Sequence, residues 1–143
     1  MRVWLVSDHA GFPLKSHLRH YLEGRYEVVD VGTFSEEATD YPYWVHRLME
    51  KFPPAERAIL ICGTGNGVCM TANRYPQVRA ALAWNPEIAC LARAHNDANV
   101  LCLPGRFLTP QEAEAIAEVF LTTPFEGGRH ERRIAQINPP TCC

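Results

Sequence analysis

The sequence predicts an α/β fold: a three-layer α/β/α domain with a five-stranded parallel sheet in the middle. Three observations lead to this prediction. Short apolar runs alternate with longer segments of helical periodicity, and this alternation occurs five times. The apolar runs contain few polar residues, as expected for strands that helices cover on both faces. The chain has 143 residues, which is the size of one domain.

Five strands and the helices between them can be placed along the chain. The first helix, at residues 13–24, repeats leucine at Leu14, Leu18 and Leu22, which gives it one apolar face. Pro42 is suited to the first position of the second helix, and the third helix should begin in or just after a glycine-rich loop. The strands are expected at residues 3–7, 26–32, 57–61, 79–84 and 100–104.

The last three helices have start signals or charge patterns of their own. Asn85 and Thr109 are each followed by proline, so both are expected to cap a helix that begins with that proline. A short basic helix can follow within residues 127–137. Because the sequence contains no repeat and no linker, we expect one domain at residues 1–137 and a C-terminal tail at residues 138–143.

Composition and charge argue against several classes of protein. Hydrophobic residues make up 47% of the chain and the net charge is −2, whereas nucleic-acid-binding domains usually have a strong basic excess. There is no recognisable signal peptide and no apolar stretch near the ~20 residues of a membrane span, so we expect a cytoplasmic protein without a membrane or nucleic-acid partner. The six cysteines show no zinc-binding spacing, and the role of Cys142 and Cys143 in the tail stays open.

The segments that directly follow the predicted strands are rich in glycine and polar residues. Ligands of open α/β sheets bind beyond the carboxyl ends of the strands. These segments therefore predict the position of the site, and they are residues 8–11, 32–33, 62–67, 84–85 and 105–106.

The most distinctive of these segments is the glycine loop that follows Cys62. Its pattern, G-x-G-x-G, lacks the spacing of the dinucleotide fingerprint and the lysine of the phosphate-binding P-loop. The loop can still direct backbone N–H groups at an anion. A helix N-terminus can also lower the pKa of a thiol. From position alone, Cys62 is equally well explained as a reactive thiolate or as a buried residue that ends a strand.

Two other pairs of polar residues have similar alternatives. Asp8 and His9 can hydrogen bond to hydroxyls or to an anion, or they can cap the following helix. His95 and Asn96 close a helix, where a histidine is also favourable because of the helix dipole.

Arg129 and Arg133 are spaced to share one face of a helix. Two guanidinium groups on one face suit a phosphate, although a solvated basic face is the alternative. Taken together, the candidate residues suit a small phosphorylated polyol: arginines for the phosphate, Asp, His and Asn for hydroxyls, and a thiol for carbon-acid chemistry.

Several motifs occur in collinear order over residues 2–137: SDHAG, DYP, ILICGTGNG, ANRYPQVRAAL, LARAHNDANVL and FEGGRHERRI. In these motifs the chain resembles the type B ribose-5-phosphate isomerase family, which includes galactose-6-phosphate isomerase subunits. The resemblance implies a Rossmann-like fold without nucleotide binding. It also implies interconversion of an aldose phosphate and a ketose phosphate through a cis-enediolate, without a metal or cofactor. The assembly it implies is a homodimer, or alternatively a tetramer, with active sites at the subunit interface.

The resemblance assigns roles by position. Cys62 would move the proton between C1 and C2, and His95 would open the furanose ring. Thr64 and the loop amides would stabilise the enediolate oxygens, as in an oxyanion hole. The sugar would be bound by Asp8, His9, Tyr41, Gly63, Gly65, Asn66, Gly67 and Asn96, and the phosphate by His9, Arg106, Arg129 and Arg133, some of them from the partner subunit.

Within this family one branch uses a glutamate in the glycine loop as the base. Here that position is apolar, at or next to Val68, and Cys62 is present, so the chain resembles the cysteine branch. The segment AWNPE, residues 83–87, differs from the more polar segment of many relatives and leaves a six-carbon sugar phosphate open as substrate. A non-catalytic sugar-phosphate-binding paralogue and a redox role of the cysteines are further alternatives.

Overall fold

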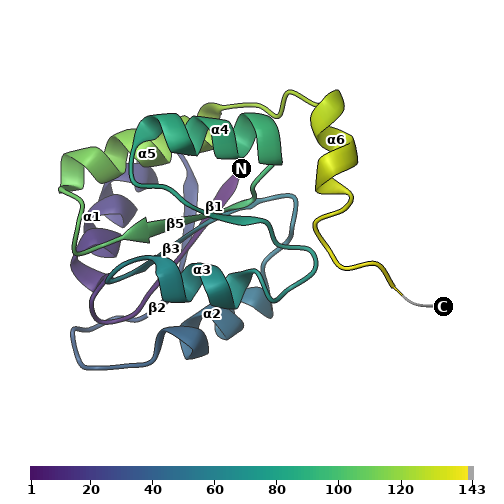
Figure 1. Cartoon of the computed structure of the whole chain (residues 1–143). Helices are drawn as coiled ribbons and strands as arrows, with labels where there is room; N and C mark the ends of the chain where they lie inside the picture. Colours follow the sequence, from purple (N-terminus) through teal and green to yellow (C-terminus); the bar gives the residue numbers. More distant parts are fainter. Residues whose placement is uncertain (142–143) are drawn as a thin grey trace.

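The computed structural model describes residues 1–141 and confirms the predicted architecture, a five-stranded parallel sheet between two layers of helices (Figure 1). The strand order is β2-β1-β3-β5-β4. The elements in chain order are β1 (Arg2–Ser7), α1 (Phe12–Glu23), β2 (Glu27–Gly32), α2 (Tyr41–Met49), β3 (Arg57–Cys62), α3 (Asn66–Ala72), β4 (Ala80–Leu82), α4 (Pro86–Asn96), β5 (Val100–Pro104), α5 (Pro110–Thr122) and α6 (Arg129–Ile134).

Alternate residues of each central strand pack on opposite faces of the sheet. In β3, Ile59 and Ile61 join a core formed with α1, α4 and α5. Leu60 and Cys62 join the second core, which is formed with α2 and α3. The period of two and burial on both faces explain why the strands read as continuous apolar runs in the sequence. The side chain of Cys62 consequently lies on the side of α2 and α3.

Because the strands are parallel, they all begin at one side of the sheet and all end at the other. We call the side where they end the carboxyl edge and the side where they begin the amino edge. Cys62 pairs with Pro104 at the carboxyl edge, where β3 and β5 end. Ala58 pairs with Val100 at the amino edge, where the same strands begin. The helix α6 stands apart from the three layers, beyond the end of α4 (Figure 1).

The predicted helix caps are confirmed. Asn85 Oδ1 accepts a hydrogen bond from the N–H of Ile88 over 2.8 Å. Thr109 and Glu112 exchange side-chain and backbone hydrogen bonds at the start of α5 and form a capping box. These local signals are strong because each cap satisfies helix N–H groups that have no partner inside the helix.

Several boundaries differ from the prediction by one residue, and those of β4 and α6 differ by more. β4 spans Ala80–Leu82 and not residues 79–84, because it is an edge strand and because the N–H of Arg79 donates to Asn99 Oδ1 over 2.8 Å. The last helix spans only Arg129–Ile134, since two glycines precede it. Along the part of the chain that the structure describes, the helices are too short or too polar to cross a bilayer. Cys142 and Cys143 lie outside the described residues.

Candidate active site

Cys62 is the last residue of β3 and stands where the glycine loop begins. Cys62 is buried, with 4% of its surface exposed to solvent. The loop turns into α3 at Gly65, whose φ of 78° lies in the left-handed region. A Cβ added at Gly65 would lie 2.5 Å from Leu82 Cδ1, so both its conformation and its surroundings require glycine. The hydroxyl of Thr64 accepts a hydrogen bond from the N–H of Asn66 over 3.3 Å, which ties the two sides of the turn together.

Two side chains from other elements lie against this loop. The ring of Tyr41, at the start of α2, packs so closely on Gly67 that a Cβ there would collide with it. Arg106 follows β5, and its N–H donates to the carbonyl of Gly63 over 3.0 Å. The guanidinium of Arg106 lies beside Gly63, with Nη1 3.2 Å from where a Cβ would be. An aromatic ring and a cation therefore flank the loop that begins at Cys62.

Asp8 and His9 follow β1 at the same carboxyl edge. Asp8 is 6% exposed, and its Oδ1 accepts a hydrogen bond from the N–H of Gly11 over 3.0 Å, in the turn that leads into α1. This contact supports the alternative in which Asp8 stabilises the start of the helix. Nδ1 of His9 lies 3.1 Å from the N–H of Thr39 and 3.2 Å from the carbonyl oxygen of the same residue, so it accepts from the first in one tautomer and donates to the second in the other. Both contacts hold the ring of His9 against the loop at Thr39.

A buried lysine secures the segment after β2 at this edge. Lys15 on α1 is fully buried, and its Nζ donates to Asp30 Oδ1 over 2.6 Å and to the carbonyl of Thr33. Burial lowers the pKa of Lys15, and the hydrogen bond to Asp30 opposes this shift. The ion pair holds Thr33 and the loop that leads to Tyr41 close to the sheet.

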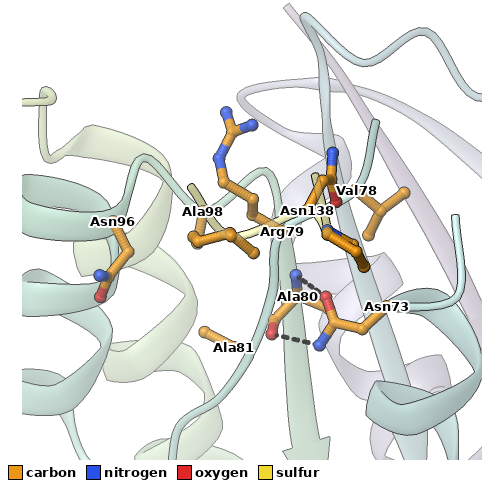
Figure 2. A pocket seen from close by; sticks show the side chains of 10 residues that line it. Asn73, Val78, Arg79, Ala80, Ala81, Asn96, Ala98 and Asn138 are labelled. Atoms are coloured by element: carbon orange, nitrogen blue, oxygen red, sulfur yellow. Dashed lines mark hydrogen bonds between the residues drawn. The ribbon is translucent and has the colours of Figure 1, made fainter. Parts of the chain in front are cut away.

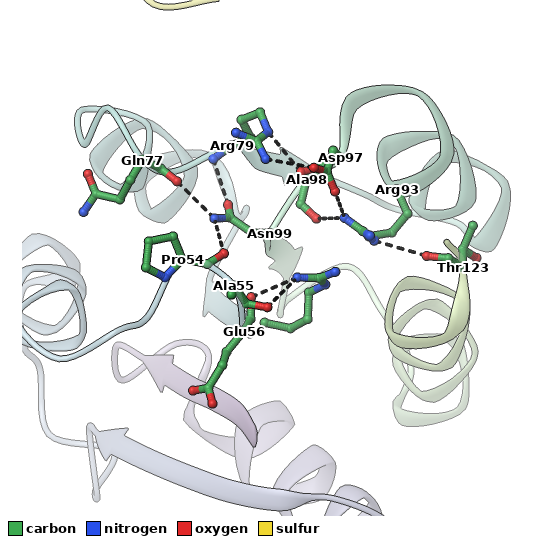
Figure 3. Close-up of polar contacts among 11 residues, drawn as sticks. Pro54, Ala55, Glu56, Gln77, Arg79, Arg93, Asp97, Ala98, Asn99 and Thr123 are labelled. Carbon is green, nitrogen blue, oxygen red and sulfur yellow. Dashed lines mark hydrogen bonds and ion pairs between the residues drawn. The ribbon is translucent and has the colours of Figure 1, made fainter. Parts of the chain in front are cut away.

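The remaining candidate residues lie at the amino edge. His95 and Asn96 end α4, and the chain then turns through Asp97 into β5. Arg93 fixes this turn: it is 4% exposed, and its guanidinium donates to Asp97 Oδ1, to the carbonyl of Ala98 and to the carbonyl of Thr123 (Figure 3). The turn and the chain after α5 are thereby joined, which places α6 next to the end of α4.

His95 belongs to a small cluster with two residues that the sequence analysis did not single out, Glu126 and His130. The rings of His95 and His130 are stacked, with centroids 4.3 Å apart. Nε2 of His95 lies 3.4 Å from Glu126 Oε2. His130 is buried, and its Nε2 has no hydrogen-bond partner. Burial and then the charge of Arg129 lower the pKa of His130, so its ring is neutral at neutral pH. In the sequence, Glu126 and His130 are four residues apart, and this i, i+4 spacing is the signal that could have indicated the cluster.

Within one chain, the structure brings together only part of the predicted site. Asp8, His9, Tyr41, Arg106 and the segment 62–67 meet at the carboxyl edge, and we call them the carboxyl-edge group. The amino-edge group lies at the opposite end of the strands and consists of His95, Asn96, Arg129 and Arg133.

A groove of about 350 Å³ also lies on the amino-edge side, beside β4 (Figure 2). Asn73 borders it, and its side chain makes two hydrogen bonds with the backbone N–H and carbonyl of Ala80. These bonds satisfy backbone groups on the outer side of β4, where no further strand pairs with it. Asn96 and Asn138 also line the groove, but Cys62 and the glycine loop do not. The groove therefore does not connect the two groups within one chain.

Comparison with known proteins defines the class of protein to which this fold and these residues belong. The model of the Ribose/Galactose Isomerase family matches residues 3–137. The chain belongs to this family. Among curated proteins, ribose-5-phosphate isomerase B of Escherichia coli is 40% identical over 133 residues, which cover 91% of this chain and 89% of that protein.

Solved structures agree with this assignment. A ribose 5-phosphate isomerase of Thermotoga maritima is 47% identical, with a TM-score of 0.92 over 95% of this chain and 96% of that chain. Ribose-5-phosphate isomerase B of Mycoplasma genitalium, solved with bound ribulose-5-phosphate, is 42% identical, with a TM-score of 0.88 over 95% and 93% of the two chains.

Proposed function

We propose that this protein is an aldose–ketose isomerase that interconverts D-ribose 5-phosphate and D-ribulose 5-phosphate through a cis-enediolate. The observation that supports this most directly is the position of Cys62, which ends the central strand β3 and opens a loop of backbone N–H groups. The family match over residues 3–137 and the ribulose-5-phosphate complex of the Mycoplasma genitalium protein support the same substrate class.

The chemistry requires a base and a stabiliser of negative charge next to each other. The thiolate of Cys62 takes the proton from one of the two carbons C1 and C2 and returns it to the other, while the hydroxyl proton passes between O2 and O1, so that the carbonyl and the hydroxyl exchange places. Thr64 and the amides of the loop 63–67 stabilise the enediolate oxygens while the proton is on sulfur. A positioned base contributes about 10²–10⁴-fold to the rate. His95 opens the furanose ring by moving a proton to or from the ring oxygen, before the carbon acid chemistry begins.

We infer further that one active site is assembled from two chains. The carboxyl-edge group and the amino-edge group lie at opposite ends of the strands of one chain, yet the reaction needs both. In a homodimer, His95, Asn96, Arg129 and Arg133 of one copy would lie over Cys62 of the other. A two-fold axis would then produce two equivalent sites, because each copy offers both surfaces. Arg129 and Arg133 are exposed, as this arrangement requires.

The first test is the activity of Cys62→Ala with ribose 5-phosphate. We expect kcat/KM to fall by at least about 10²-fold, since the base is removed. Cys90→Ala is the matched control, because Cys90 is a partly buried cysteine on α4, which packs on the opposite face of the sheet from Cys62. Full activity of Cys62→Ala would refute the assigned base.

A six-carbon sugar phosphate is the second candidate substrate. Trp84 follows β4 at the carboxyl edge and is 55% exposed, so a large side chain is free on the edge of the sheet that carries Cys62. Values of kcat/KM for ribose, allose and galactose phosphates decide between the substrates, because specificity is the ratio of these values. Tight binding of every sugar phosphate without turnover would instead favour a non-catalytic paralogue.

A further inference from the structure

The cluster of His95, Glu126 and His130 has the composition and spacing of a metal site. One ligand atom from each residue can be chosen so that all three lie within 4.8 Å of one another. Both histidines direct Nε2 at the same carboxylate, His95 at 3.4 Å and His130 at 3.9 Å. Tetrahedral zinc with bonds of 2.0–2.2 Å places its ligand atoms about 3.4 Å apart, close to the spacing of these atoms. Because the two rings are stacked with an interplanar angle of 16°, one ring has to rotate about its side-chain bonds for both Nε2 lone pairs to reach the same ion.

The buried nitrogen of His130 is an independent indication of a missing ligand. The side chain of His130 is 8% exposed, and its Nε2 finds no hydrogen-bond partner in the described structure. A buried polar atom without a partner destabilises a fold by about 1–3 kcal/mol. Two imidazole nitrogens beside one carboxylate are a common set of ligands for zinc.

We propose that His95, Glu126 and His130 bind a divalent transition-metal ion of the zinc and nickel class, and that this ion inhibits the enzyme by occupying His95. The isomerisation itself uses the thiolate of Cys62 and does not involve the ion. Three protein ligands leave one position open for water. The inhibition rests on the proposed role of His95 in ring opening, whereas metal binding does not.

The surrounding charges set the expected strength of the site. Arg129 and Arg133 lie on the same short helix as His130, so their positive charges repel a cation bound there. Glu126 is the one acidic member of the cluster, and its side chain is 52% exposed, which leaves it free to adjust its position. The balance of charge predicts an inhibitory site of moderate affinity, from which a chelator can remove the ion.

The test is calorimetric titration of the full, untagged chain with NiCl₂, followed by assays of isomerase activity at the same nickel concentrations. Nickel is the probe because imidazole suits it, whereas thiolates of the six cysteines are softer ligands. The variants are Glu126→Gln, which keeps the size of the side chain, and His130→Phe, which keeps a stacked ring without the nitrogen. Glu131→Gln is the matched control, since Glu131 is an exposed glutamate of α6 outside the cluster.

We expect nickel to bind the wild type and Glu131→Gln equally, and each of the other two variants at least about tenfold more weakly, because even loss of a supporting partner weakens metal sites by ~10–100-fold. Activity should fall as nickel saturates the wild type and return with a chelator. Equal nickel binding by all four proteins would overturn the proposed site. Glu126-dependent binding without inhibition would overturn only the inhibitory role. A wild type that is inactive without metal would contradict the proposed function, while the titration would still decide the site.

Discussion

The two edges of the sheet are built by different means. At the carboxyl edge, backbone geometry shapes the glycine loop: Gly65 adopts a left-handed conformation, and Tyr41 packs directly on Gly67. At the amino edge, side chains hold the structure: Arg93 joins the turn after α4 to the chain after α5, and Asn99 joins the segments before β3 and β4 (Figure 3). The carboxyl edge surrounds a buried thiol, whereas the amino edge presents the exposed side chains of Arg129 and Arg133 and the partly exposed ring of His95.

This difference indicates how the proposed active site is divided. A buried base needs a rigid wall, which a chain can build from its own backbone. Phosphate recognition needs long cationic side chains, which can be offered to a second copy from a helix that stands outside the three layers.

The largest effect should come from mixing two inactive variants. Cys62→Ala damages the carboxyl edge and Arg133→Ala the amino edge. If each site takes one edge from each of two chains, a heterodimer of the two variants has one intact site.

After equal amounts are unfolded and refolded together, about a quarter of wild-type activity should return, as expected for random pairing in a symmetric two-site dimer. Steady-state assays of the mixture and of each refolded variant measure this. Activity no greater than that of the separate variants would contradict a shared site.

Gly65→Ala should damage the carboxyl edge alone. A Cβ at φ 78° is strained and would overlap Leu82, so we expect a loss of about 2–4 kcal/mol of unfolding free energy and a large loss of activity. Urea unfolding measures the stability. Gly24→Ala is the control, because its φ is −72° and no atom lies within 4 Å of the added Cβ. Equal stability of the two variants would show that the loop is not constrained as described.

Arg93→Met should loosen the amino edge alone. The variant removes the guanidinium that donates hydrogen bonds to Asp97, Ala98 and Thr123. We expect the free energy of unfolding to fall by about 1–3 kcal/mol and the KM for the sugar phosphate to rise. Alkylation of Cys62 by iodoacetamide, followed by mass spectrometry, should proceed at the wild-type rate. A faster alkylation would mean that the two edges are not independent.

The smallest effect concerns acid stability at the amino edge. Glu56 precedes β3, and hydrogen bonds from Trp4 and then Arg2 hold its pKa below the ordinary value of 4.5. A carboxylate with a lowered folded pKa stabilises the protein above its unfolded pKa, and this contribution disappears as the pH falls through the folded pKa. Thermal unfolding between pH 6 and about 3 should therefore depend more steeply on pH for wild type than for Glu56→Gln. Identical slopes would exclude this contribution.

The sequence was sufficient for the features that depend on local pattern. Apolar runs predicted the sheet, Asn85 and Thr109 predicted two helix starts, and polar residues after the strands predicted the carboxyl-edge group. It was not sufficient where contacts join distant segments. Lys15 reads as a polar helix residue, yet it is fully buried because Asp30, on the next strand, pairs with it.

The amino edge shows the same limit. The stacking of His95 on His130 depends on how α6 meets α4, and no periodic pattern encodes that meeting. The predicted length of β4 was too great for a related reason. This strand pairs with β5 alone, and its paired residues are fewer than the residues of its apolar run. Residues 1–137 as one domain and the tail after them stay predictions.

The close contact between Tyr41 and Gly67 has a consequence for how the protein tolerates change. A Cβ at Gly67 would lie 2.4 Å from the ring of Tyr41, so alanine there requires this ring to move away or residue 41 to become smaller. Variation at these two positions is therefore coupled: a side chain at position 67 displaces the aromatic ring that borders the glycine loop.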